Sequence, residues 1–134
     1  MKGLVEAVLV GSGGFAGSVC RYLLTVAASH FGGPFPLGTL AANLLGCLVM
    51  GALSVFFLQF GQFGPGPRLL LATGFCGGFT TMSAFIHEVD KVARDGAPLL
   101  ALGYLVLTLA GCCAALLAGA GMARWACLVW RAGS

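Results

Sequence analysis

The sequence predicts an all-α integral membrane protein with four transmembrane helices, the third of them broken near the middle of the membrane. The chain is 59% hydrophobic and only 8% charged, whereas about a quarter of the residues of a soluble domain are charged. Its mean hydropathy is +0.99. Glycine- and proline-rich turns divide it into apolar segments of about 20 residues, the length that spans a bilayer. We therefore expect residues 1–134 to form a single membrane domain.

The first span is expected at residues 4–29, where a turn rich in glycine and proline ends it. Lys2 followed by an apolar run has a weak similarity to a signal peptide. However, Gly11–Gly14 interrupts the run and Arg21 follows it. We therefore interpret this segment as a retained first span.

The second span is expected at residues 37–60, ended by the glycines and prolines of 61–67. The third is expected at 69–89, with a polar helical extension through Arg94 that emerges into water. That extension has two charge pairs at helical spacing, Glu88 with Lys91 and Asp90 with Arg94. Pro98 is suited to open a helix, so the fourth span is expected at 98–122.

The centre of the third span is the run Gly74–Phe85, which is rich in glycine and threonine. Glycine disfavours helix by about 1 kcal/mol relative to alanine, so this run is expected to break the helix. Lipid cannot satisfy the backbone groups that a break frees, so they must be buried in protein or line a polar path. Ion sites in membranes are built in this way.

The charges are weakly biased between the two sides of the membrane. An even number of spans puts both termini on one side, so the cations divide as Lys2, Arg68, Arg124 and Arg131 against Lys91, Arg94 and Arg21. Such a small bias favours insertion in either orientation. The chain could then pair with an inverted copy, although a weakly biased protein of single topology would show the same numbers.

Polar residues within the spans have helical spacing. Thr39 and Asn43 are i,i+4 on the second span, and Tyr104 and Thr108 repeat this spacing on the fourth. They could simply hydrogen-bond neighbouring helices. Together with a broken helix, they suggest a hydrophilic path. Arg21 could snorkel or act as a ligand, and either role adds positive potential at a vestibule.

Several function classes lack the residues they need. Seven lysines and arginines are too scattered for a nucleic-acid surface. The histidines and acidic residues lie at span ends without the partners that an enzyme's metal or nucleophile requires, so we expect no enzyme. The six cysteines lie in apolar runs without zinc-ligand spacing, and we interpret them as buried hydrophobic residues rather than disulfide or metal ligands.

Three ordered motifs resemble the CrcB or Fluc family of fluoride channels. They are Gly13-Gly14-x-x-Gly17 with Arg21-Tyr22, Leu37-Gly38-Thr39-Leu40-x-x-Asn43-x-x-Gly46, and Gly74-Phe75-Cys76-Gly77-Gly78-Phe79-Thr80-Thr81 with Ser83 and Phe85. The fourth span matches by size and by Tyr104. The resemblance implies a multi-pass channel of the plasma or inner membrane that exports fluoride passively from the cytoplasm.

The resemblance also implies an antiparallel, dual-topology homodimer with two fluoride pores and a central structural sodium ion. It assigns the sodium ligands to the backbone carbonyls of Gly77 and Thr80. A break near the middle of the third span agrees with this arrangement. In an inverted pair the two-fold axis lies in the membrane plane, so two such breaks can face each other.

By the same resemblance, Asn43 lies on the pore path and Phe85 contacts fluoride through its positively polarised ring edge. Met82 stands where the family has the first phenylalanine of an aromatic pair, so the fluoride rate or the occupancy of one site is in question. A contact between a ring edge and a small anion is weak, so the anion can leave again. The remaining candidate pore residues carry hydroxyl groups: Thr39, Thr81, Ser83, Tyr104 and Thr108.

Two other classes remain open. A small multidrug exporter shares the size, the four spans and the dual topology, but it needs a carboxylate deep in its first span, where Glu6 is poorly placed. A membrane assembly subunit without transport activity would explain the glycines as packing positions. Flux measurements in liposomes would separate these classes from a channel.

Overall fold

The computed structural model describes residues 1–31, 35–59 and 64–133, and these form helices joined by short turns. The elements are α1 (Lys2–Ser29), α2 (Leu37–Gln59), α3 (Pro65–Arg68), the π-helix η1 (Leu69–Cys76), α4 (Gly77–Phe79), α5 (Met82–Arg94) and α6 (Pro98–Ala132). Elements α3 to α5 follow one another as a single helical run. Within the described residues, four segments are long and apolar enough to cross a membrane. The predicted all-α membrane class is thereby confirmed.

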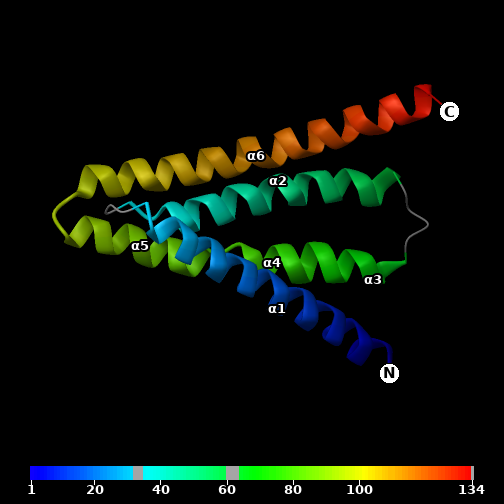
Figure 1. The fold of residues 1–134 in the computed structure, drawn as a ribbon, viewed down its shortest axis with the longest axis horizontal. Coiled ribbons are helices and arrows are strands. Elements are labelled where there is room, and N and C mark those ends of the chain that lie inside the picture. The colour runs from blue at the N-terminus through cyan, green and yellow to red at the C-terminus, as the bar shows by residue number, and fades with distance from the viewer. Residues whose placement is uncertain (32–34, 60–63, 134) are drawn as a thin grey trace.

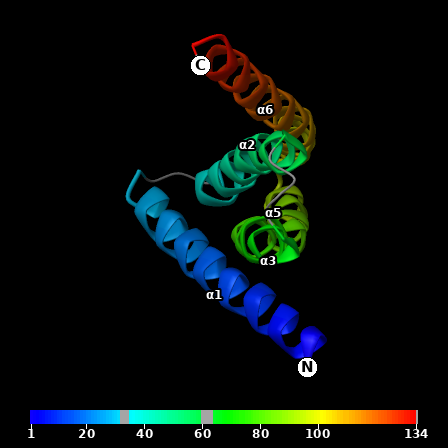
Figure 2. The same ribbon diagram turned by 90° about the vertical axis from the view of Figure 1, so that its right-hand side faces the viewer.

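The helices lie side by side along the long axis of the molecule (Figure 1). Both termini and α3 lie at one end, whereas the turn between α5 and α6 lies at the other. Viewed from the end, α2 lies between α6 and the α3–α5 run, and α1 crosses obliquely on the far side from α6 (Figure 2). The closest helix pairs are α2 with α6 and α1 with η1.

Glycines allow these two pairs to approach closely. A Cβ on Gly13 would collide with the Leu70 carbonyl, and one on Gly74 would collide with the Val10 carbonyl. In the other pair, a Cβ on Gly119 would meet the Leu48 carbonyl. Small residues at helix contacts are typical of membrane proteins, in which close backbone packing replaces the hydrophobic effect between helices.

Three helices extend beyond the expected spans, and the first of them, α1, begins at Lys2 instead of residue 4. The third helical run begins at Pro65 instead of residue 69 and continues to Arg94, while α6 continues past Met122 to Ala132. Helix α2 ends at Gln59, and the last residue of the expected 37–60 span lies outside the described residues. The ends of these helices can stay helical beyond the apolar span, because a helix pairs its own backbone groups both in lipid and in water.

Of the two charge pairs expected at the end of α5, the structure shows one, and the acidic residue of the other has different partners. Arg94 forms the expected ion pair with Asp90, with Nη2 2.9 Å from Oδ2. Glu88 instead accepts hydrogen bonds from two neighbouring helices. The reason is position: Glu88 is partly buried on the side of α5 that faces α2 and α6, whereas Lys91 is exposed.

The third helical run is interrupted three residues after Gly77. Gly77 itself is helical, with φ −63° and ψ −38°. The extended residues are Thr80, at φ −86° and ψ 157°, and Thr81, at φ −150° and ψ 124°. Glycine content therefore marks the region, but the β-branched threonines, which suit extended backbone, occupy the interruption itself.

Candidate functional site: the cavity at Thr80 and Thr81

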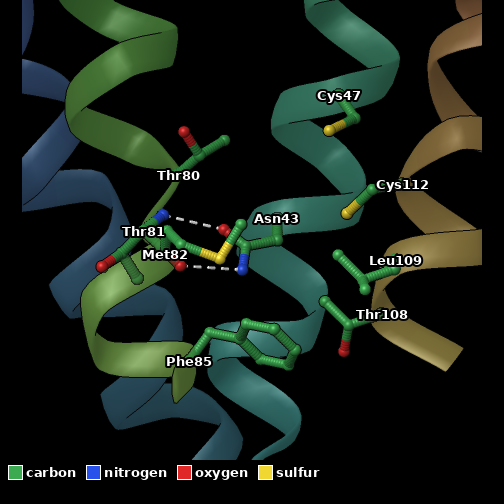
Figure 3. Close-up of a pocket in the computed structure, with 9 residues that line it drawn as sticks. All are labelled: Asn43, Cys47, Thr80, Thr81, Met82, Phe85, Thr108, Leu109 and Cys112. Carbon is green, nitrogen blue, oxygen red and sulfur yellow. Dashed lines mark hydrogen bonds between the residues drawn. The ribbon is translucent and has the colours of Figure 1, made fainter. Parts of the chain in front are cut away.

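A cavity of about 220 Å³ lies beside the interruption, between α2, α6 and the start of α5. None of the residues that line it is charged (Figure 3). They are Asn43, Cys47, Thr80, Thr81, Met82, Phe85, Thr108, Leu109 and Cys112. The cavity thus brings together six of the candidate site residues predicted from the sequence and adds three that were not predicted.

Asn43 holds the extended backbone in place. Its Nδ2 donates to the Thr81 carbonyl at 3.0 Å, and its Oδ1 accepts from the Thr81 N–H at 2.8 Å (Figure 3). One amide side chain thereby bonds to both backbone groups of Thr81, the residue that precedes α5. Asn43 is 7% exposed, so few other side-chain types could fill this position without leaving a buried polar group unpaired.

The two threonines use their hydroxyls on the backbone. Thr81 caps α5, because its Oγ1 accepts from the Ala84 N–H at 3.3 Å. Ser83 Oγ lies 3.4 Å from the same hydroxyl. Thr80 Oγ1 donates to the Cys76 carbonyl at 3.0 Å. The threonine hydroxyls therefore stabilise the interruption in addition to bordering the cavity.

The interruption releases two carbonyls from their helical partners. In a continuous helix the Thr81 N–H would donate to the Gly77 carbonyl, and the Ala84 N–H would donate to the Thr80 carbonyl. Here the Thr81 N–H donates to Asn43, and the Ala84 N–H donates to Thr81 Oγ1. Gly77 is exposed, and no side chain or distant backbone lies within 4 Å of where its Cβ would be.

Phe85 and Met82 border the cavity in different ways. The Phe85 ring is 1% exposed and packs edge-to-face against Tyr104, with centroids 5.0 Å apart at 76°. Tyr104 makes a second edge contact with Phe35, at 5.1 Å. Met82, one turn away from Phe85 on α5, is 62% exposed. The chain therefore packs around the Phe85 ring but leaves most of the Met82 side chain uncovered.

Thr108 provides an unused polar atom at the cavity. The residue is 2% exposed, and its Oγ1 is buried without a hydrogen-bond partner among the described residues. Leaving such a group unpaired costs about 1–3 kcal/mol. Thr108 Oγ1 is itself closed off from the cavity, so the residue becomes a donor to a ligand or water there when its side chain turns toward that space.

Glu88 is a site residue that the sequence analysis assigned to the helix end. Its Oε1 accepts from Thr39 Oγ1 at 2.7 Å, and its Oε2 accepts from the Tyr104 hydroxyl at 2.9 Å. These bonds join α2, α5 and α6. The sequence could have indicated that Glu88 lies near the site, because it follows Thr81 by seven residues, or two helical turns, on the helix that borders the cavity.

Arg21 lies against the same helical run from the opposite side. Its Nε donates to the Gly78 carbonyl at 3.2 Å, and Ser18 Oγ donates to that carbonyl at 3.3 Å. Arg21 does not line the cavity. Its guanidinium nevertheless places a positive charge two residues before the interruption.

Comparison with known proteins identifies the family. The family model described as CrcB-like protein, Camphor Resistance (CrcB), matches residues 8–120. The chain belongs to the CrcB family. Among its relatives are proteins named "Fluoride-specific ion channel FluC". Those of Chlorobaculum tepidum and Prosthecochloris aestuarii are 47% and 44% identical, over 89% and 87% of this chain and 94% and 91% of the relative. That of Clostridium perfringens is 41% identical, over 84% of this chain and 88% of the relative.

This CrcB protein is a multi-pass protein of the cell membrane, since family and helix composition agree. Its structure separates the predicted site residues into groups. One group lines the cavity: Asn43, Thr80, Thr81, Met82, Phe85 and Thr108. A second lies on the Glu88 carboxylate: Thr39 and Tyr104. The others lie outside the cavity lining: Ser83, Arg21 and Gly77.

Proposed function

We propose that this chain is a fluoride-selective ion channel that lets fluoride leave the cytoplasm passively. The observation that carries the proposal is its similarity, over most of its length, to relatives named as fluoride-specific ion channels. The uncharged cavity supports it independently, because a conducting site must bind an ion weakly enough to release it.

The cavity offers the weak donors that a small anion needs. The Phe85 ring presents an edge of positive electrostatic potential, and Thr108 has a hydroxyl that is not otherwise engaged. Asn43 contributes by holding Thr81 in its extended shape. Thr39 and Tyr104 already donate to Glu88, so they become fluoride ligands only by leaving that carboxylate.

We further propose an antiparallel homodimer with two pores and a sodium ion at its centre. The carbonyls of Gly77 and Thr80 fit such an ion, because both have lost their helical donors at the interruption. The open space beside Gly77 leaves room for a partner. When bound, sodium would supply a fixed positive charge that ties two such interruptions together.

Many large apolar side chains on the outer surface are consistent with a partner as well as lipid. Met82, Ile86 and Leu71 are 62%, 48% and 40% exposed on the third helical run. An inverted copy placed against this run would cover them. It would also close the open side of the cavity at Met82.

Fluoride efflux from liposomes tests the proposed function. The purified chain is reconstituted into vesicles loaded with potassium fluoride, and a potassium ionophore then starts efflux, which a fluoride electrode records. A channel gives rapid fluoride efflux that needs no proton gradient, and no comparable chloride efflux. Drug exchange driven by protons would indicate an exporter, and the absence of any flux would indicate an assembly subunit.

A further inference from the structure

We propose that Cys47 and Cys112 form a binding site for a thiophilic metal cation inside the cavity, and that the bound cation blocks the ion path. The two residues come from different helices, α2 and α6, and both line the cavity. Helices α2 and α6 pack closely against each other, and the Cys47 and Cys112 side chains lie near each other where the two helices border the cavity. Figure 3 shows both sulfur atoms on the cavity side of their helices. The blocking step rests on the proposed channel function, whereas the binding step does not.

The other cysteines differ from this pair in their surroundings. Cys20 and Cys113 are exposed on the outer surface of the protomer, and Cys76 is only 1% exposed and does not line the cavity. Cys127 lies in the C-terminal part of α6, far along the helix from Cys112. Cys47 and Cys112 are therefore the pair of thiols that an ion entering the cavity would meet.

The donor set determines which metal the site would take. Within the described residues there is no group of three or more histidine, cysteine, aspartate or glutamate side chains, so the four ligands of a structural zinc site are not present there. Two thiols suit soft ions that accept low coordination numbers, such as Cu⁺, Ag⁺ and Hg²⁺. The thioether of Met82 adds a third soft donor to the same cavity.

Binding needs no oxidant or reductant. Each thiol loses its proton to water as its sulfur bonds to the metal, so Hg²⁺ and two thiols give a neutral bis-thiolate and two protons. The cavity has room for this product, because its volume is about 220 Å³. The metal would then occupy the space in front of Asn43 and Thr108, which the proposed path requires for fluoride.

The binding step is tested first, on full-length protein kept reduced with a phosphine that is removed before use. The probe is mercuric chloride, added at increasing ratios to the purified chain. Bis-thiolate formation is followed by its ultraviolet charge-transfer absorbance. Cysteine labelling followed by mass spectrometry then reports which thiols the metal protects. We expect Cys47 and Cys112 to become protected together, at about one equivalent of metal, as a two-thiolate site requires.

Serine variants provide the matched comparison. Cys47→Ser and Cys112→Ser each remove one ligand, and Cys113→Ser removes the neighbouring exposed thiol on the same helix. We expect the metal concentration that halves fluoride efflux to rise about tenfold or more in the first two variants, since loss of even an outer-shell partner commonly weakens metal sites by that factor. Cys113→Ser should match the parent protein. Each variant is normalised to its own flux without metal.

Two results would overturn the proposal. One is protection of other cysteines while Cys47 and Cys112 stay reactive. The other is equal metal sensitivity of efflux in the Cys47→Ser, Cys112→Ser and Cys113→Ser variants. If the protein conducts no fluoride but protects both thiols, the metal site stands and the proposed channel function fails.

Discussion

At the scale of single residues, Asn43 determines the shape of the site. Its amide makes two hydrogen bonds to the Thr81 backbone, so substitution with leucine, which has a similar volume, would remove both bonds and leave the Thr81 N–H without its acceptor. Each unpaired group costs about 1–3 kcal/mol. We therefore expect Asn43→Leu to lower the melting temperature of the protein in detergent and to abolish fluoride efflux. A melting temperature equal to that of the parent protein would contradict this role.

Phe85 and Met82 allow the aromatic edge to be tested separately from packing. Phe85→Ile keeps apolar bulk but removes the edge, and we expect a sharp fall in fluoride efflux. It also removes the ring contact with Tyr104, which is worth about 0.5–1.5 kcal/mol. The melting temperature should therefore fall slightly, and efflux must be compared at a temperature where both proteins are folded.

Met82→Phe is the complementary substitution. Met82 is 62% exposed within the protomer, so a ring fits there without disturbing the packing of Phe85. It adds a second positive edge at the cavity, and we expect efflux to rise or to stay unchanged in a liposome assay. Because each 1.4 kcal/mol of barrier is about tenfold in rate, a modest contact energy is measurable. If Met82→Phe abolishes efflux in folded protein while Phe85→Ile changes nothing, the aromatic face is not the pore wall.

At the scale of helices, the glycines have two distinct roles. Gly13, Gly74 and Gly78 allow α1 to touch the third helical run, as the predicted collisions of a Cβ with the opposite backbone show. Gly77, by contrast, has open space beside it. The sequence alone does not distinguish these neighbours, since both are glycine in the same run.

Alanine should therefore destabilise the chain at Gly78 but not at Gly77. A Cβ at Gly78 would lie on the Gly14 backbone, with the Gly14 Cα 2.9 Å away, and backbone cannot move aside as a flexible side chain can. Overpacking of this kind costs about 1–3 kcal/mol. We expect Gly78→Ala to reduce thermal stability and Gly77→Ala to leave the isolated protomer unchanged.

Sedimentation in detergent, with and without sodium, extends the same comparison to assembly. If Gly77 faces a partner, Gly77→Ala should weaken the dimer or its sodium dependence although the protomer tolerates it. Unchanged assembly, sodium dependence and flux in Gly77→Ala would show that the carbonyl assignment to Gly77 is wrong.

The sequence predicted the helices well because their apolar length and turn composition are local properties. The positions of Asn43, Thr80, Thr81 and Phe85 around one site came from family motifs, and the structure shows the contacts that join several of them. Glu88 was assigned to a solvated helix end because its spacing to Lys91 fits an ion pair. Its bonds to Thr39 and Tyr104 depend on how three helices pack against one another. The spacing of residues along one helix gives no information about that packing.

At the scale of the whole molecule, the protomer leaves much apolar surface uncovered. Only 11% to 33% of the residues in the four apolar windows are buried. Lipid covers such a surface well, but it cannot donate to the Gly77 carbonyl, which has lost the Thr81 N–H as its helical donor. The dimer proposed above would therefore be stabilised at this backbone group rather than by apolar surface alone.

Dual topology is the prediction that belongs to this scale. The described cations lie at both ends of the helices, with Lys2 and Arg68 at the end that carries the termini and Lys91 and Arg94 at the end with the α5–α6 turn. Since neither end has a strong excess of positive charge, insertion should proceed in both orientations.

Single cysteines placed at Asp95 and at Gly133, in a background without the six native cysteines, should each react with an impermeant maleimide from both sides of the membrane. About half of the molecules should react from each side if antiparallel pairs form with equal numbers of both orientations. Labelling of Asp95→Cys from one side alone, and of Gly133→Cys from the opposite side alone, would show a single topology and would contradict the antiparallel dimer.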